Sequence, residues 1–236
     1  RVRRAIAYAI DRDAIVRSFL RGAGRLATGM LTPENWAYSP SVTTYSFDPE
    51  RARQLLDQAG YPAAPDGTRA LEFEYKTTPE GTRLAEVFQA MLRQVGIMLD
   101  IRTLEWATYY GDLQAGKFEI TSLQWIGAND PNQYYLTFDS KMIPPNGNNR
   151  GYYSNPEMDR LVEAGQVTVD RDARRKIYAQ VQALAAADLP YISLWWLDNV
   201  AVMNRGLSGF ESYPNGSLRS LASVTLSAPG AAEPSE

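Results

Sequence analysis

Hydrophobic residues recur at helical spacing in several segments of this chain, and most of these segments carry start or stop signals. One segment begins with Asp48 at the N-cap and Pro49 at the first helical position, and its apolar residues then share one face. Another runs from Pro79 to Gly96 with a wide apolar stripe that must be buried against something large. The pattern predicts helices that begin near residues 2, 49, 79, 106, 156 and 171.

Strand-like runs lie between these helices. LEFEYKTT from Leu71 and IMLDIRTL from Ile97 flank the helix that opens at Pro79, which predicts a βαβ unit with parallel strands and a right-handed crossover. Further strand-like runs are FEITSLQW from Phe118 and YISLWWLDNVAV from Tyr191. Strands alternating with helices indicate an α/β fold.

We find no composition break that would mark a linker, so a single lobe over residues 1–225 is the simplest organisation. The last residues, 226–236, are small, polar and rich in Pro, and we expect this tail to be disordered. The chain opens without Met on a segment that is already helical, which suggests a part of a longer protein.

Composition narrows the possible functions. The chain has no Cys and no His, so thiol nucleophiles, zinc-thiolate sites and the commonest general base are excluded. We therefore expect no metal held directly by this chain, no cofactor and no enzyme activity. A net charge of −3 gives no basic footprint for nucleic acid, and no apolar run is long enough to insert into a membrane.

The most informative stretch follows the run from Phe118, where the turn residues IGANDPN replace the strand pattern. We expect a buried strand to hold Trp125 rigidly and the turn to leave Asn129 and Asp130 free to meet a ligand. Asp130 has a second interpretation, since Asp before Pro131 is also a common turn cap.

A second polar loop, NGNNRGYYSN from residue 146 to 155, offers Arg150 and Tyr152 as binding candidates, with plain solvated surface as the alternative. Trp196 is a candidate because neighbouring Trp residues on a strand point to opposite faces, so one of the pair would face a cleft and the other the core. Trp36 is a further candidate, although it could equally pack its loop against the lobe.

The chain as a whole resembles the C-terminal lobe of a family 5 extracellular solute-binding protein, from the oligopeptide, dipeptide and nickel-binding group of ABC importers. Each matching segment is weak by itself, but their order and spacing are specific. The segments are VRRAIAYAIDRDAIV, YSFDPERARQLLDQAGYP, LRQVGIMLDI, the EW pair at 105–106, GKFEITSLQW followed by DP, YYSNPEMDRLVEAG and DLPYISLW.

The resemblance implies a periplasmic-binding-protein-like α/β lobe, with a mixed sheet flanked by helices on both faces. It implies a cleft that closes on a small, peptide-like solute, with a missing N-terminal lobe as the other wall and ABC transporter permease subunits as partners. It also implies a periplasmic or extracellular location, for a protein that is either secreted or lipid-anchored through a segment upstream of Arg1.

In the peptide-binding members of this family, an acidic residue shortly after the tryptophan holds the α-ammonium group of the peptide. This sequence departs from that pattern, because the segment is one residue short and Ala128 stands in place of the acid. The anchor is then absent, displaced to Asp130 or supplied by the other lobe. The solute itself cannot be identified from the sequence.

A second function class stays open on the residues alone. Aromatic side chains with carboxylates such as Glu105, Asp130 and Asp139 could supply the acid and base of a carbohydrate-active enzyme, or the surface of a carbohydrate-binding module. Their spacing is not diagnostic, and we therefore favour a binding lobe that holds solute weakly when the other lobe is absent.

Overall fold

The predicted helices of this chain begin and end close to where its capping residues, prolines and glycines indicate. The computed structural model describes residues 1–127, 129–213 and 216–226. Helices and helical turns in these ranges are α1 (Val2–Ala9), α2 (Arg12–Ala14), η1 (Ile15–Phe19), α3 (Pro49–Gln58), η2 (Pro79–Gly81), α4 (Thr82–Arg93), α5 (Trp106–Gln114), α6 (Gln133–Phe138), α7 (Pro156–Val167), α8 (Arg171–Asp188) and η3 (Arg219–Ser223). The strands are β1 (Gly24–Leu26), β2 (Glu72–Thr77), β3 (Met98–Thr103), β4 (Ile120–Thr121), β5 (Trp195–Leu197), β6 (Leu207–Ser208) and β7 (Thr225–Leu226).

Side-chain caps confirm the predicted helix starts. The carboxylate of Asp48 accepts a hydrogen bond from the backbone N–H of Arg51 at 2.8 Å, and Asp170 accepts one from Ala173 at 2.8 Å. Helix α8 ends where Leu189 adopts a left-handed conformation with φ of 54°, directly before a proline that cannot continue the helix.

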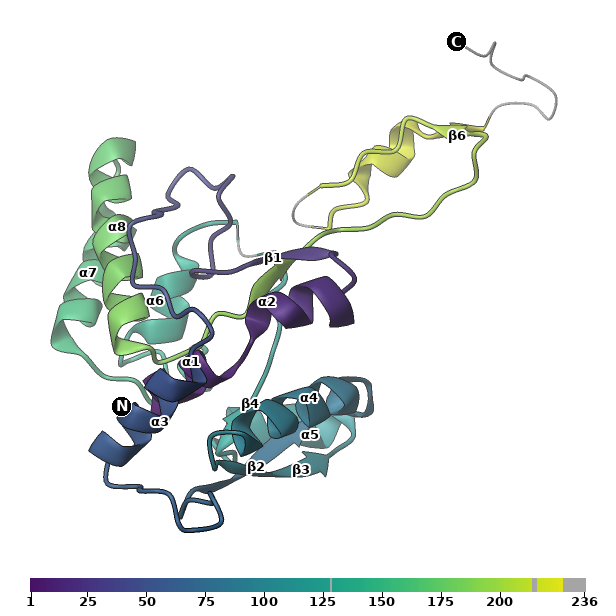
Figure 1. Ribbon diagram of the computed structural model, residues 1–236. Coiled ribbons are helices and arrows are strands. Elements are labelled where there is room, and N and C mark those ends of the chain that lie inside the picture. Colours follow the sequence, from purple (N-terminus) through teal and green to yellow (C-terminus); the bar gives the residue numbers. More distant parts are fainter. Residues whose placement is uncertain (128, 214–215, 227–236) are drawn as a thin grey trace.

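The predicted βαβ unit is confirmed, since β2 pairs in parallel with β3 on one side and with β4 on the other. Helix α4 covers one face of this sheet, where the ring of Tyr75 lies 6.0 Å from that of Phe88. Lys76 points to the opposite face and meets Asp112 of α5. Helices therefore lie on both faces of the parallel sheet, as Figure 1 shows in its lower part.

The expectation of a single mixed sheet is not met. The sheet β3-β2-β4 is entirely parallel, and the antiparallel pairs β1-β5 and β6-β7 form separate ladders. Strand β5 pairs with β1, where Trp196 lies opposite Arg25, and among the described residues it pairs with no strand of the parallel sheet. The α/β class is confirmed, while the strands fall into three small sheets.

Among the described residues, two large apolar cores and one small cluster hold these elements. The first core joins α1, α3, α4 and the parallel sheet around Leu56, Phe88 and Ile97, which are nearly or fully buried. The second joins α6, α7 and α8 around Tyr134 and Tyr178. Burial of such large side chains is the main stabilising contribution to each core.

Two predicted strands are much shorter than their hydrophobic patterns suggest. In the run from Phe118 to Trp125, only β4 is strand, because its pairing with β2 covers only Ile120 and Thr121. Ser122 directly follows the strand, and its carbonyl accepts a hydrogen bond from the Tyr109 hydroxyl at 2.6 Å. Trp125 therefore follows the strand in an irregular segment, and the expectation that a buried strand delivers it was wrong. In the run from Tyr191, only β5 forms a strand.

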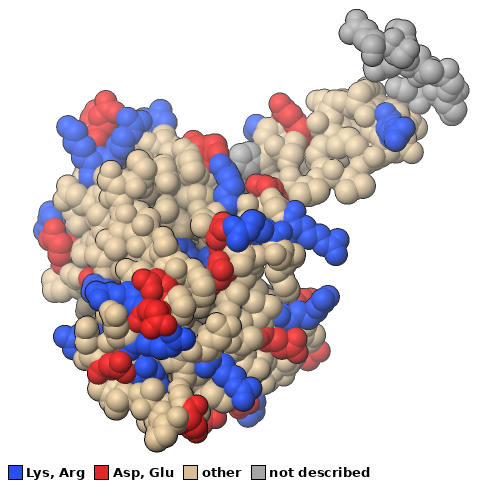
Figure 2. Space-filling model, viewed as in Figure 1, with Lys and Arg blue, Asp and Glu red and all other residues tan. Residues whose placement is uncertain are grey.

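The segment after β5 projects from the body as an arm that carries η3 and the β6-β7 ladder (Figure 1). Several of its apolar side chains are exposed, among them Val200, Val202, Leu218 and Leu226. The space-filling view shows few charged residues on this arm, whereas both signs of charge are interspersed over the body (Figure 2). In the described ranges, no helix combines the length and apolarity needed to cross a bilayer.

Candidate functional site

Helix α5 presents a row of side chains at four-residue spacing on one face. Trp106, Tyr110 and Gln114 lie along this row, whereas Tyr109 and Leu113, on the flank of the row, are buried. The Trp106 ring stacks on that of Tyr110, with centroids 5.6 Å apart and planes 21° apart, and Trp106 remains 56% exposed. An exposed stacked pair of this kind is available to a ligand.

Arg150 reaches the same helix face from the polar loop. Its Nε donates to the side-chain oxygen of Gln114 at 3.0 Å, and its Nη2 donates to the Tyr110 hydroxyl at 3.3 Å and to the side-chain oxygen of Asn148 at 2.9 Å. The guanidinium carbon lies 5.5 Å from the centre of the Tyr110 ring and 5.6 Å from that of Trp125. Two candidates from the sequence, Trp125 and Arg150, therefore lie together.

We call the group Trp106, Tyr110, Gln114, Trp125 and Arg150 the Arg150 site. Its three members on α5 are not among the candidates chosen from the sequence. Their spacing of four residues does place them side by side on one face of a helix. What that spacing cannot show is which loop the face would meet.

The loop that carries Arg150 is held rigidly by its neighbour. Asn149 is only 1% exposed, and its amide donates to the carbonyls of Asp139 at 3.1 Å and Tyr153 at 2.7 Å while accepting from the backbone N–H of Tyr153 at 2.9 Å. The hydroxyl of Tyr191 donates to the carbonyl of Asn148 at 3.1 Å. Arg150 is therefore positioned before any ligand arrives.

Tyr152, another candidate, lies over the end of α5. A Cβ at Gly116 would sit only 2.6 Å from the Tyr152 hydroxyl, so the glycine leaves room for this ring to lie close to the backbone. Gly116 also has φ of 68°, and Tyr152 itself adopts a left-handed φ of 52°. The ring stays more than half exposed next to the Arg150 loop.

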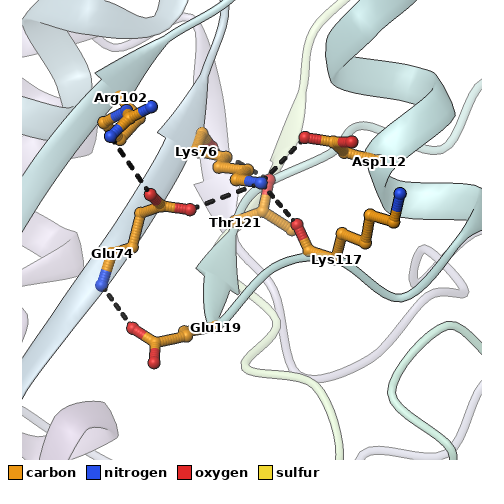
Figure 3. A network of polar contacts seen from close by, with 7 residues as sticks. All are labelled: Glu74, Lys76, Arg102, Asp112, Lys117, Glu119 and Thr121. Carbon is orange, nitrogen blue, oxygen red and sulfur yellow. Dashed lines mark hydrogen bonds and ion pairs between the residues drawn. The ribbon is translucent and has the colours of Figure 1, made fainter.

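A polar network joins α5 to strand β2 of the parallel sheet, as Figure 3 shows. Lys76 donates to Asp112 of α5 at 2.8 Å and to the carbonyl of Lys117 at 2.6 Å, and it lies 3.3 Å from Glu74. The hydrogen bond from Lys76 lowers the pKa of the Asp112 carboxyl, and the same bond raises the pKa of Lys76. Both groups stay charged at neutral pH and hold the helix in place.

The other candidates from the first turn lie in a separate group beside α8. Asp130 accepts a hydrogen bond from the backbone N–H of Asn132 at 2.8 Å and forms an ion pair with Arg174 at 3.1 Å. The carbonyl of Asn129 accepts a hydrogen bond from the side-chain amide of Asn35 at 2.6 Å. Asp130 therefore caps its turn and neutralises the charge of Arg174 on α8.

Trp36 joins this second group. The guanidinium carbons of Arg171 and Arg174 lie 5.1 Å and 5.5 Å from its ring centre, and its carbonyl accepts a hydrogen bond from Arg175 at 2.8 Å. These contacts pack the loop that carries Trp36 against α8. They agree with the alternative that Trp36 packs its loop against the lobe.

Trp196 lies apart from both groups. Its indole N–H donates to the carbonyl of Gly29 at 3.0 Å, and its ring meets that of Tyr38 edge to face at 6.0 Å. Its neighbour Trp195 packs against the first core, so the two rings do point to different sides.

Ala128, which stands in place of the amine-binding acid, lies outside the described residues. The carboxylates considered for glycoside chemistry have unrelated surroundings. Asp139 is fully buried, Asp130 is ion-paired, and Glu105 occupies the exposed N-cap position of α5. Within the described ranges, no group of three or more His, Cys, Asp or Glu side chains could hold a metal ion.

Comparison with known proteins identifies the family. Residues 1–143 match the model for bacterial extracellular solute-binding proteins, family 5 Middle. The chain belongs to this family. The dipeptide-binding protein of Escherichia coli is 30% identical over 192 residues, which cover 80% of this chain and 36% of that protein.

Solved structures of family members have the same fold. The oligopeptide-binding protein AppA from Bacillus subtilis, in complex with a nonapeptide, has a TM-score of 0.87 at 28% identity over 96% of this chain and 47% of that one. The ABC transporter-associated periplasmic binding protein DppA from Helicobacter pylori, in complex with the peptide STSA, has a TM-score of 0.80 at 25% identity over 95% of this chain and 43% of that one. The chain spans about two fifths of the length of the curated relatives that it matches.

Proposed function

We propose that this chain is the C-terminal lobe of a two-lobed solute-binding protein, which captures a peptide-like solute for an ABC importer. The observation that carries this proposal is the Arg150 site, where exposed and half-buried aromatic rings lie beside pre-positioned polar groups. Membership of the solute-binding family supports it. Relatives named for dipeptides and a neighbour that holds a nonapeptide support peptides as the solute class.

The projecting arm supports the two-lobed organisation. An arm that leaves Val200, Val202 and Leu226 exposed is costly in water unless other parts of a longer protein cover it. We propose that the missing lobe packs there and supplies the opposite wall of the cleft. We also propose that the protein works outside the cytoplasmic membrane, with permease subunits as its partners.

Binding by closure then follows from simple thermodynamics. A solute that touches both lobes only in the closed state shifts the population towards that state, whereas a single lobe offers half of the contacts. We therefore expect the isolated chain to bind the solute of the longer protein much more weakly.

The test uses the longer protein that contains this chain. Native mass spectrometry would look for a co-purified solute, and a thermal-shift screen against di- to pentapeptides would look for stabilisation. We expect peptides to co-purify or to stabilise the protein, and permease subunits to be pulled down with it. Failure of every peptide to bind, or sub-micromolar peptide binding by the isolated chain, would contradict the proposal.

A further inference from the structure

Arg150 is a buried cation without a carboxylate partner. Its residue is 6% exposed, yet the ion pairs of the described residues do not include it. The partners of its Nε and Nη2 are neutral oxygens, namely those of Gln114, Tyr110 and Asn148. Burying a charge among neutral groups is costly, and proteins usually offset the cost with an opposite charge.

Two other arginines in the described part of the chain, the buried Arg69 and the half-buried Arg12, offer a comparison. Arg69 forms an ion pair with Asp57 and donates to the carbonyl of Val95 at 2.9 Å. Arg12 donates from both Nη nitrogens to backbone carbonyls of distant segments. These hydrogen bonds hold the loop between β1 and α3 in place. Arg150 differs from Arg69 because it has no carboxylate partner, and it differs from Arg12 because no hydrogen bond joins one of its Nη nitrogens, Nη1, to the described residues.

The free nitrogen of Arg150 reaches the surface. Within the described residues, the buried side-chain atoms that lack a hydrogen-bond partner are Asp139 Oδ2 and Tyr178 Oη. Nη1 of Arg150 is not among them, so this atom keeps some contact with solvent. The guanidinium therefore offers an unused edge next to the rings of Trp125 and Tyr110.

The surroundings keep this edge ready for an anion. Asn149 fixes the loop, and the two rings shield the guanidinium from bulk water, which strengthens a charge-assisted hydrogen bond. The planar fork of arginine matches two carboxylate oxygens better than a lysine ammonium does.

We propose that Arg150 is the anion anchor of this lobe and binds a carboxylate group of the solute. Trp106, Tyr110 and Trp125 then contact the apolar part of the solute next to that carboxylate. The inference rests on the proposed function, and it names the solute class more closely as a compound that carries a carboxylate beside an apolar or aromatic group. A peptide C-terminus with a large apolar side chain fits this description.

The test compares acids with their neutral amides, using the longer protein that contains this chain. One probe pair is the dipeptide Ala-Phe and Ala-Phe amide, and the other is phenylacetate and phenylacetamide, both followed by calorimetry and tryptophan fluorescence. Because loss of one member of a shielded, hydrogen-bonded charge pair weakens binding strongly, we expect each acid to bind at least about 30-fold more tightly than its amide.

The variant Arg150→Met removes the charge and keeps an apolar side chain of similar reach. It should weaken acid binding to the level of the amide and leave amide binding nearly unchanged. Arg150→Lys should retain part of the preference, whereas Arg93→Met removes the same charge from an exposed position on α4 and should retain all of it. If Arg150→Met does not fold, the change in the acid-to-amide ratio of Arg150→Lys decides the question.

The outcomes separate the anchor from the proposed function. Peptide binding with no preference for the acid form would keep the function and overturn the anchor. Phenylacetate binding that depends on Arg150, without any peptide binding, would support the anchor and refute the peptide function. A wild-type protein that prefers neither acid over its amide, or a preference that survives in folded Arg150→Met, would overturn the anchor.

Discussion

The Asn149→Ala substitution tests whether the Arg150 loop is built as rigidly as its contacts indicate. The Asn149 amide makes three hydrogen bonds to the backbone of Asp139 and Tyr153, and Asn149 itself is only 1% exposed. At about 1 kcal/mol net for each bond, and somewhat more for backbone groups left without a partner, we expect the free energy of unfolding to fall by about 3–4 kcal/mol.

Urea denaturation measures this loss, and the midpoint should fall while the slope of free energy against urea stays unchanged. In a thermal scan the same loss corresponds to a melting temperature lowered by about 6–16 °C for a chain of this size. Asn146→Ala is the matched control, because it removes the same amide from an exposed position in the same loop and should change stability by no more than about 0.5 kcal/mol.

A loss for Asn149→Ala that is no larger than the loss for the control would refute the reasoning, because it would mean that water or local rearrangement replaces these hydrogen bonds. The binding assay adds a second readout. If Asn149 positions Arg150, the folded variant should also lose part of the acid-over-amide preference, although Asn149 itself is too buried to touch the solute.

The remaining predictions concern the elements around the site. Lys76→Met should lower the melting temperature by several degrees because it leaves Asp112 without its ion-pair partner, whereas Lys117→Met should change it little; equal effects would contradict the network in Figure 3. Gly116→Ala should destabilise by about 1–3 kcal/mol because its φ is positive. Gly111→Ala, inside α5 with open space around it, should stabilise by about 0.5–1 kcal/mol, and the opposite order in denaturation experiments would refute this assignment. Burial raises the pKa of the Asp139 carboxyl above its ordinary 3.8, so the folded state binds this proton more tightly than the unfolded chain does. Stability should then fall as pH rises through the window above 3.8, and Asp139→Asn should reduce that fall; identical stability profiles of the two proteins over that window would contradict it.

Local signals in the sequence were sufficient for much of the fold. The N-caps Asp48 and Asp170 and the βαβ unit all depend on residues close together in the chain, where periodicity and capping chemistry decide the outcome. The length of β4 depends instead on how far β2 extends beside it, and that pairing joins residues 45 positions apart, as in Tyr75 opposite Ile120. An apolar run therefore could not show where its ladder ends.

The candidate site was predicted in part for the same reason. Trp125 and Arg150 could be chosen as loop residues of suitable chemistry, but their meeting with α5 depends on the tertiary arrangement. Trp106 was predicted as part of a short amphipathic helix and of a family motif, and neither signal shows whether the side chain is buried or exposed. Its exposure of 56% became evident only in the folded chain.

The two arginines near the predicted turn explain why this lobe is better suited to a carboxylate than to an ammonium group. Arg174 is neutralised by Asp130. Asp130 is the acid to which the α-ammonium anchor could have been displaced, and its ion pair with Arg174 makes it less available for that role. Arg150, beside Trp125, has only neutral partners among the described residues and one nitrogen free to bind. An ammonium group placed next to Trp125 would meet an uncompensated like charge, whereas a carboxylate there would neutralise it. If the solute is a peptide, its amine should therefore be held by Asp130 after rearrangement or by the opposite lobe, and Asp130→Asn should leave the acid-over-amide preference intact.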